Sequence, residues 1–163
     1  MRFCVVGAGA MGGVYGLSLI EAGYEVNFLD IDRDHVNAVR ENGFRLSGIG
    51  EQKVLKINIS DDENDFKNSA DVVLFHAHTT GTKSAARSAA TVLKPDGYAI
   101  TLQNGIGNIE ALSEVLGATR VVGGISYHSA ALEDLGHVNH TNGGSTFIGE
   151  LDGTISLLSL IHI

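Results

Sequence analysis

The feature that most constrains this chain is a glycine pattern near its N-terminus. Gly7-Ala8-Gly9-Ala10-Met11-Gly12 follows a short apolar run, Arg2–Val6, and precedes a helical pattern that stops at Gly23. In a strand–turn–helix unit, the first glycine permits the tight turn, the second lets a pyrophosphate approach the backbone, and the third lets the helix pack closely on the strand. The helix N-terminus adds free N–H groups and a positive dipole. The pattern predicts dinucleotide binding; the alternative is that these glycines serve close packing alone.

Strand and helix patterns alternate along most of the chain. Strands are predicted at residues 2–6, 25–29, 70–75, 98–102 and 120–126, and helices at residues 11–22, 32–42, 85–93 and 106–116. Strands that alternate with helices through short connections form a mostly parallel sheet with helices on both faces. We therefore expect a Rossmann-like, doubly wound α/β fold.

Two segments interrupt this alternation. Residues 44–47 and 54–59 surround Gly48-Ile49-Gly50, and their alternating apolar residues predict a half-exposed β-hairpin insertion. Residues 137–141 and 145–148 flank Asn142-Gly143-Gly144, which predicts a second hairpin and therefore antiparallel C-terminal strands.

An acidic residue closes the second predicted strand. Asp30 is expected to accept hydrogen bonds from the adenosine ribose, and because a carboxylate repels a 2′-phosphate, it favours NAD over NADP. Arg33 could offset this preference by pairing with such a phosphate. The alternative for Asp30 is a solvated carboxylate at a strand end.

Composition disfavours several other classes of protein. The 163 residues are 44% hydrophobic, enough for one core, while a net charge of −8 and the absence of Trp disfavour nucleic-acid binding. No apolar run reaches the length of about 18 residues that a membrane span needs, so no membrane association is expected. The single cysteine, Cys4, cannot form an internal disulfide and suits a reducing, cytoplasmic location.

Three segments together resemble the N-terminal domain of the ketopantoate reductases (2-dehydropantoate 2-reductases). They are the loop Gly7–Gly12; Leu102-Gln103-Asn104-Gly105-Ile106-Gly107-Asn108 with Glu110 and Leu112; and residues 124–130 leading to residues 136–138 and 148–150. The resemblance covers residues 1–150, which are expected to form the dinucleotide-binding domain. Residues 154–163 do not resemble the expected domain junction, and we interpret residues 151–163 as a truncated or non-native tail; the alternative is a native final strand or helix. The resemblance also implies a C-terminal helical domain that this chain lacks.

The resemblance implies reduction of a 2-keto acid by NADPH, as in the conversion of ketopantoate to pantoate in pantothenate biosynthesis. NADP is the expected cofactor, with NAD possible because of Asp30, and the full-length form is expected to be a homodimer. Asn104 matches the asparagine beside the nicotinamide ribose and the substrate, although it could instead cap the helix that follows. Ala130 matches a position whose backbone lies near the cofactor.

His78 marks a departure from the family. It stands where family members usually carry a lysine that contacts the cofactor, and an imidazole is shorter and not reliably cationic near neutral pH. The resemblance implies that the general acid is a lysine of the missing domain, so the catalytic residue is unknown and His78 is a weak candidate. The cofactor-binding residues expected from motif and resemblance are Gly7, Ala8, Gly9, Ala10, Met11, Gly12, Asp30, His78, Asn104 and Ala130.

Two alternative functions remain open. The pairs His76-x-His78 and His137-x-x-His140 could bind zinc, but no cysteine is near and no acidic residue accompanies either pair, so no metal is expected. The chain could also be a free-standing dinucleotide-binding module with a regulatory or interaction role and no chemistry of its own. The cofactor domain of a reductase and such a module would share the glycine loop, so the loop does not distinguish between them.

Overall fold

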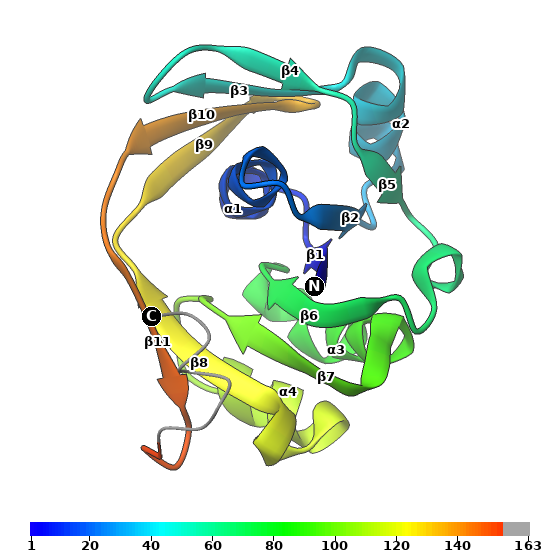
Figure 1. The fold of residues 1–163 in the computed structure, drawn as a ribbon, viewed down its shortest axis with the longest axis vertical. Coiled ribbons are helices and arrows are strands. Elements are labelled where there is room, and N and C mark those ends of the chain that lie inside the picture. Colours follow the sequence, from blue (N-terminus) through cyan, green and yellow to red (C-terminus); the bar gives the residue numbers. More distant parts are fainter. Residues whose placement is uncertain (155–163) are drawn as a thin grey trace.

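The computed structural model describes residues 1–154 and shows a mixed α/β domain (Figure 1). Its strands are β1 (Arg2–Val6), β2 (Glu25–Leu29), β3 (Phe44–Gly48), β4 (Lys53–Leu55), β5 (Asn58–Ser60), β6 (Ala70–Phe75), β7 (Leu93–Thr101), β8 (Val121–Ser126), β9 (Ser129–Asp134), β10 (His137–Asn142) and β11 (Thr146–Glu150). Its α-helices are α1 (Ala10–Glu21), α2 (Arg33–Asn42), α3 (Thr82–Val92) and α4 (Asn108–Leu116), and its short 3-10 helices are η1 (Glu63–Phe66), η2 (Thr79–Gly81) and η3 (Ala118–Arg120).

The main sheet confirms the predicted doubly wound fold. Its strand order is β11-β8-β7-β6-β1-β2-β5, in which all neighbours from β5 to β8 are parallel and β11 is antiparallel to β8. This is the dinucleotide-binding order, with the chain reversing direction of travel between β1 and β6. The crevice at such a switch point is where doubly wound proteins bind their ligands.

Each face of the main sheet has its own core, because successive side chains of β1 point in opposite directions. Phe3 and Val5 pack with α1, α2 and the second sheet, whereas Cys4 and Val6 pack with α3 and α4. Helix α1 is enclosed between the main sheet and a second sheet of order β4-β3-β10-β9 (Figure 1).

The glycines of α1 make this enclosure possible. A Cβ at Gly16 would lie 2.3 Å from Cζ of Phe28 in β2, and one at Gly13 would lie 2.8 Å from a methyl group of Val138 in β10. The helix therefore buries a face of glycines with Val14 and Leu17.

The predicted insertion is present, but its second strand is divided. β4 pairs antiparallel with β3, whereas β5 joins the main sheet parallel to β2, with Asn58 Nδ2 donating to Asn27 Oδ1 at 2.8 Å. The prediction of one continuous strand over residues 54–59 was wrong because the segment passes from one sheet to the other, burying Ile59 beside β2.

The predicted C-terminal antiparallel strands are present, but the hairpin turn lies elsewhere. β10 pairs with β9 and β11 pairs with β8, so the turn falls at Leu135-Gly136 rather than at residues 142–144. The two arms form one long ribbon that bends from the main sheet into the second sheet (Figure 1). At the bend the Tyr127 N–H donates to the Ser145 carbonyl at 3.0 Å, and a Cβ at Gly144 would lie 2.5 Å from the Tyr127 carbonyl oxygen. Gly144 therefore allows the two arms of the ribbon to approach closely at the bend, and residues 142–144 do not form a hairpin turn.

The structure also differs from two local predictions. The expected turn at Pro95-Asp96-Gly97 lies within β7, as an irregularity whose carbonyls at Lys94 and Gly97 accept hydrogen bonds from Arg120. The helix expected from residue 106 begins at Asn108, because Gly107 adopts a left-handed φ of 92°. In the part of the chain that the structure describes, no helix has both the length and the apolar character of a membrane span.

Candidate functional site

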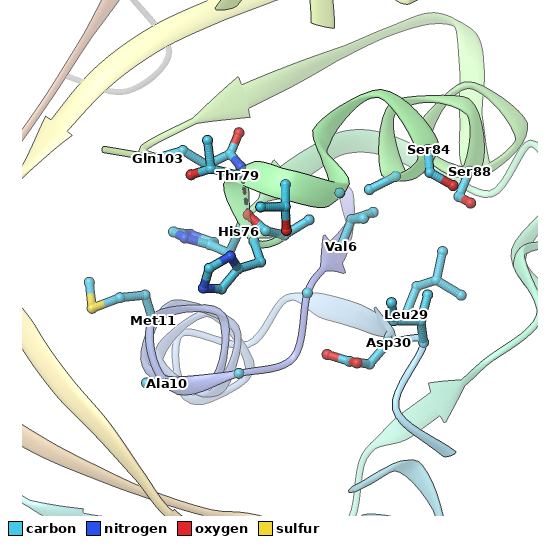
Figure 2. A pocket seen from close by; sticks show the side chains of 18 of the residues that line it. Val6, Ala10, Met11, Leu29, Asp30, His76, Thr79, Ser84, Ser88 and Gln103 are labelled. Carbon is cyan, nitrogen blue, oxygen red and sulfur yellow. Dashed lines mark hydrogen bonds between the residues drawn. The ribbon is translucent and has the colours of Figure 1, made fainter. Parts of the chain in front are cut away.

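A cavity of about 580 Å³ lies at the carboxyl ends of the central parallel strands. It is bounded by the loops that follow β1, β2, β5, β6 and β7, by the start of η1 and by one face of α3. Figure 2 shows Met11, His76 and Gln103 toward one end of this cavity and Asp30, Ser84 and Ser88 toward the other. Its position is the switch-point crevice expected for a dinucleotide.

The three motif glycines play separate roles. Gly7 has a φ of 97°, and its N–H donates to the Leu29 carbonyl at 2.9 Å; a Cβ there would lie 2.6 Å from the carbonyl carbon of His76. A Cβ at Gly12 would lie 1.9 Å from the Gly7 carbonyl oxygen. A Cβ at Gly9, which lines the cavity, would meet nothing within 4 Å. Packing therefore accounts for Gly7 and Gly12, whereas no contact within the protein requires a glycine at position 9, so Gly9 leaves space for a ligand.

The N-terminus of α1 is open to an anion. Gly9 is its N-cap residue and supplies no side-chain hydrogen bond, and the first turn carries no acidic residue. The first N–H groups of the helix therefore keep their capacity to bind an anion such as a pyrophosphate.

Asp30 ties the glycine loop to the end of β2. Its Oδ2 accepts from the Ala8 N–H at 2.6 Å and its Oδ1 accepts from the Asp32 N–H at 2.9 Å. The carboxylate also lines the cavity, so it is held in place with lone pairs left for a ribose diol. The alternative of a merely solvated carboxylate does not account for these two bonds.

Gln103 holds the opposite wall of the cavity together, a role that sequence reasoning missed. Its Nε2 donates to the Ala77 carbonyl at 2.5 Å and to Thr82 Oγ1 at 3.2 Å, joining the end of β7 to the loop after β6. Thr82 in turn donates to Asn108 Oδ1 at 3.0 Å, linking the starts of α3 and α4. The polar residues at the end of a predicted central strand were the available signal.

Asn104 lines the cavity and does not cap α4. The N-cap residue is Gly107, and it is the Asn104 carbonyl oxygen that accepts a hydrogen bond, at 2.9 Å, from Asn108 Nδ2. The side chain of Asn104 makes no hydrogen bond within the described part of the chain, so it is available to a ligand.

Two histidines follow β6 and differ in environment. His78 is exposed at the cavity wall. The ring of His76 stacks on Tyr15 with centroids 5.3 Å apart, and its Nε2 is shielded from water without a hydrogen-bond partner among the described residues. Burial lowers the pKa of His76 from 6.5 to about 4, so its imidazole is neutral at physiological pH. Sequence reasoning did not single out His76 for the cavity.

The structure brings most of the predicted cofactor residues together. Seven line the cavity: Gly7, Gly9, Ala10, Met11, Asp30, His78 and Asn104. Ala8 and Gly12 support the loop from behind. Ala130 lies in β9, paired with His140 and packed against the α1 side of the core, and it is not among the described residues that line the cavity.

The second histidine pair considered for a metal has side-chain partners within the protein. His137 Nε2 lies 2.8 Å from Ser47 Oγ, and His140 Nε2 lies 3.0 Å from His128 Nδ1. Among residues 1–154, no group of three or more His, Cys, Asp or Glu side chains is arranged to hold a metal ion.

Comparison with known protein families agrees with this geometry. The model of the family described as ketopantoate reductase PanE/ApbA matches residues 3–153. The chain belongs to this family. It is 33% identical over 155 residues to a 2-dehydropantoate 2-reductase of Archaeoglobus fulgidus and 34% identical over 155 residues to one of Halobacterium salinarum. These alignments cover 95% and 94% of this chain but 49% and 50% of the relatives, so the chain spans about half the length of the curated relatives it matches.

Solved structures of the family share the fold. A PanE/ApbA family ketopantoate reductase from Ralstonia eutropha superposes with a TM-score of 0.83 at 32% identity, covering 91% of this chain and 49% of that one. A D-mandelate dehydrogenase in a ternary structure with NADH and anilino(oxo)acetate superposes with a TM-score of 0.86 at 25% identity, covering 93% and 48%. The ketopantoate reductase fold therefore includes proteins that bind NADH.

Proposed function

We propose that this chain is the dinucleotide-binding half of a reductase that converts a 2-keto acid to a 2-hydroxy acid. The observation that carries the proposal is the switch-point cavity, where the open Gly9 position, the uncapped start of α1 and the fixed Asp30 carboxylate meet. Family membership supports ketopantoate as the substrate and pantothenate biosynthesis as the pathway. The buried free thiol of Cys4 is compatible with a cytoplasmic location.

The residues present fit a nicotinamide dinucleotide. The start of α1 would hold the pyrophosphate, Asp30 the adenosine ribose, and Asn104 with Gln103 would flank the nicotinamide end of the cavity. When bound, the reduced nicotinamide supplies the hydride for the keto carbon. Asn104 can orient a carbonyl or hydroxyl group through its free amide, but it cannot release a proton at neutral pH.

The cofactor expected from the resemblance is NADPH, whereas Asp30 favours NADH. The D-mandelate dehydrogenase that shares this fold was solved with NADH. We propose NADH for this chain, because Asp30, Asp61 and Glu63 line the cavity and no lysine or arginine is among the described lining residues. We also propose, from the resemblance, that residues 1–150 form the cofactor domain. The full-length form would add a helical domain and form a homodimer. Residues from 155 onward lie outside those described.

A second candidate function is a dinucleotide-binding module without chemistry. It is favoured by one observation: the described residues that line the cavity include no lysine or arginine, and the two histidines there do not form an evident general acid. The two candidates share the same binding site and differ only in turnover.

Amide NMR spectroscopy tests the proposed binding site directly. We expect titration with NADH to shift the amide signals of the glycine loop, Asp30, Gln103 and Asn104, because these groups surround the cavity. The same titration tests Ala130, whose predicted contact with the cofactor requires its amide to shift as well. Absence of any saturable shift at millimolar NADH would contradict the proposed function.

A further inference from the structure

The adenosine end of the cavity is strongly anionic. Three carboxylates line it: Asp30 at the end of β2, Asp61 after β5 and Glu63 in η1. Among the described residues that line the cavity, none is lysine or arginine. A phosphate group placed beside Asp30 would therefore meet several negative charges and no cation of the cavity wall.

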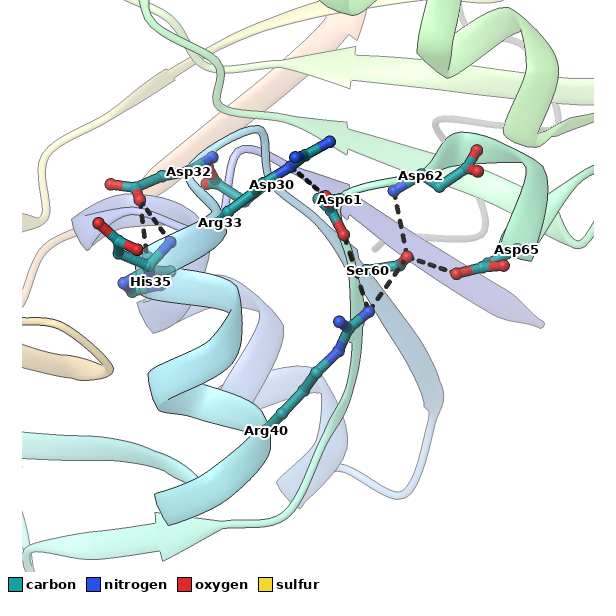
Figure 3. Close-up of polar contacts among 10 residues, drawn as sticks. Asp30, Asp32, Arg33, His35, Arg40, Ser60, Asp61, Asp62 and Asp65 are labelled. Atoms are coloured by element: carbon teal, nitrogen blue, oxygen red, sulfur yellow. Dashed lines mark hydrogen bonds and ion pairs between the residues drawn. The ribbon is translucent and has the colours of Figure 1, made fainter.

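Two arginines of α2, Arg33 and Arg40, pair with Asp61 (Figure 3). Arg33 Nε lies 2.9 Å from Asp61 Oδ2, and Arg40 Nη2 lies 4.0 Å from Asp61 Oδ1. Arg40 is also fixed to β5, because its Nε donates to the Ile59 carbonyl at 3.0 Å. Arg33 is thus the single arginine of this pair that could turn toward a ribose phosphate.

The Arg33–Asp61 pair does not remove the negative charge of this end. The Arg33 side chain is 82% exposed and that of Asp61 is 27% exposed, so the pair is weak on its own and could open. If Arg33 turned toward a 2′-phosphate, however, Asp61 would lose its main partner next to a group that carries a charge of about −2. Attraction by one arginine would then be opposed by three carboxylates.

The same residues suit an unphosphorylated ribose. A carboxylate accepts hydrogen bonds from both hydroxyl groups of a diol, and Asp30 is already oriented by the N–H groups of Ala8 and Asp32. A diol carries no charge, so Asp61 and Glu63 do not repel it.

We propose that this cavity selects NADH over NADPH and that Asp61 is a specificity-determining residue, because it adds negative charge beside the ribose position and engages Arg33. This inference rests on the proposed dinucleotide function. Asp61 belongs neither to the glycine motif nor to the end of β2, so its role in specificity is additional to theirs.

Isothermal titration calorimetry of the 163-residue chain with NADH and with NADPH tests the proposal. We expect wild-type protein to bind NADH at least about tenfold more tightly, since about 1.4 kcal/mol of repulsion has that effect. Asp61→Asn removes one charge and frees Arg33, so the NADPH-to-NADH ratio of Kd values should fall several-fold. Adding Arg33→Leu to Asp61→Asn should restore part of the discrimination.

Glu114→Gln is the matched control. Glu114 pairs with Lys83 at 2.7 Å on the surface between α4 and α3, and it does not line the cavity. Its neutralisation changes the net charge as Asp61→Asn does, and the ratio of Kd values should stay at the wild-type value. Raising the salt concentration should reduce the wild-type discrimination, because partly exposed charges are screened.

The outcomes separate this inference from the proposed function. Wild-type protein that binds neither dinucleotide would contradict the proposed function itself. Binding of NADPH as tight as that of NADH, or a ratio that Asp61→Asn and Glu114→Gln leave equally unchanged, would overturn the inference while leaving dinucleotide binding in place.

Discussion

At the scale of single residues, a substitution at Gly9 tests ligand binding without disturbing the fold. A Cβ at this position meets no protein atom within 4 Å, so Gly9→Val should leave the folded structure almost unchanged while filling the space for the pyrophosphate. We expect the Kd for NADH to rise at least about tenfold, with a Tm close to that of the wild-type chain. Calorimetric titration and thermal unfolding measure the two quantities.

Gly12 provides the contrast within the same motif. A Cβ there would lie 1.9 Å from the Gly7 carbonyl oxygen, so Gly12→Ala should lower the Tm whether or not a dinucleotide is present. Equal NADH affinity in Gly9→Val and wild-type protein would show that the pyrophosphate lies elsewhere.

The lowered pKa of His76 predicts that the stability of the folded chain depends on pH. Because burial lowers the pKa of folded His76 to about 4 from 6.5, the unfolded chain binds more protons than the folded chain between these values. The free energy of unfolding should therefore fall as the pH is lowered through this window, with His76 contributing about 2 kcal/mol of the loss by pH 4.5.

Urea unfolding at pH 7 and pH 4.5 measures this contribution. His76→Asn should lose less stability on acidification than the wild-type chain, whereas His78→Asn, at an exposed position, should lose as much as the wild-type chain. Identical losses in all three proteins would show that His76 does not titrate with a lowered pKa.

At the scale of elements, α1 depends on its glycines because it lies between two sheets. Alanine normally stabilises a helix by up to about 1 kcal/mol relative to glycine. At Gly16, however, the added methyl group would lie 2.3 Å from Cζ of the buried Phe28, and overpacking typically costs about 1–3 kcal/mol. Gly16→Ala should therefore destabilise the chain in urea titrations.

Gly149→Ala is the control for Gly16→Ala. Gly149 lies in β11, where an added Cβ meets nothing within 4 Å, and its substitution should change the free energy of unfolding by less than about 0.5 kcal/mol. If Gly16→Ala were as mild as Gly149→Ala, Phe28 would have to move more easily than its full burial indicates.

Elements with local signals could be predicted, and those that depend on distant partners could not. The central strands and the helices carry apolar runs, caps and stop glycines, and Asp32 caps α2 through the Asp34 and His35 N–H groups as its position predicts. The bent ribbon was mispredicted because Asn142-Gly143-Gly144 has the composition of a turn, while the close approach of Tyr127 is visible only in the folded chain.

The same distinction applies to the candidate site. The glycine loop and Asp30 were predictable because their motif spacing encodes their role. The contributions of His76, Gln103 and Asp61 to the cavity were not predicted, because each acts through contacts with residues far away in the sequence.

At the scale of the whole molecule, the described residues include an exposed apolar face formed by β8, β11 and Tyr127. Ile125 and Phe147 are cross-strand neighbours, and the ring of Tyr127 lies 6.3 Å from that of Phe147, yet these side chains are 60–63% exposed. Exposed apolar groups of this kind mark surfaces that contact another protein part. We expect the half of the family's length that this chain does not span to pack there.

Because this apolar face is exposed, we expect the 163-residue chain to bind a hydrophobic dye. Phe147→Ser should reduce the fluorescence of bound bis-ANS, whereas Leu135→Ser, which removes an exposed leucine from the turn between β9 and β10, should have a smaller effect. Similar dye binding by wild-type protein and Phe147→Ser would place the apolar surface elsewhere.

The last prediction concerns turnover. Reduction of a keto group requires a proton or a strong hydrogen bond at the oxygen while hydride reaches the carbon, and a general acid typically contributes about 10²–10⁴-fold. Among the cavity residues, Asn104 cannot release a proton, His76 is neutral because burial lowers its pKa to about 4, and His78 is exposed to water. We therefore expect the 163-residue chain to bind NADH but to oxidise it with ketopantoate, or with other 2-keto acids, far more slowly than about 1 s⁻¹, the lower range of ordinary enzymes.

Absorbance at the wavelength of reduced nicotinamide measures the rate. A rate near 1 s⁻¹ that His78→Asn abolishes would instead identify His78 as the general acid, and would show that the cofactor half carries the complete reaction.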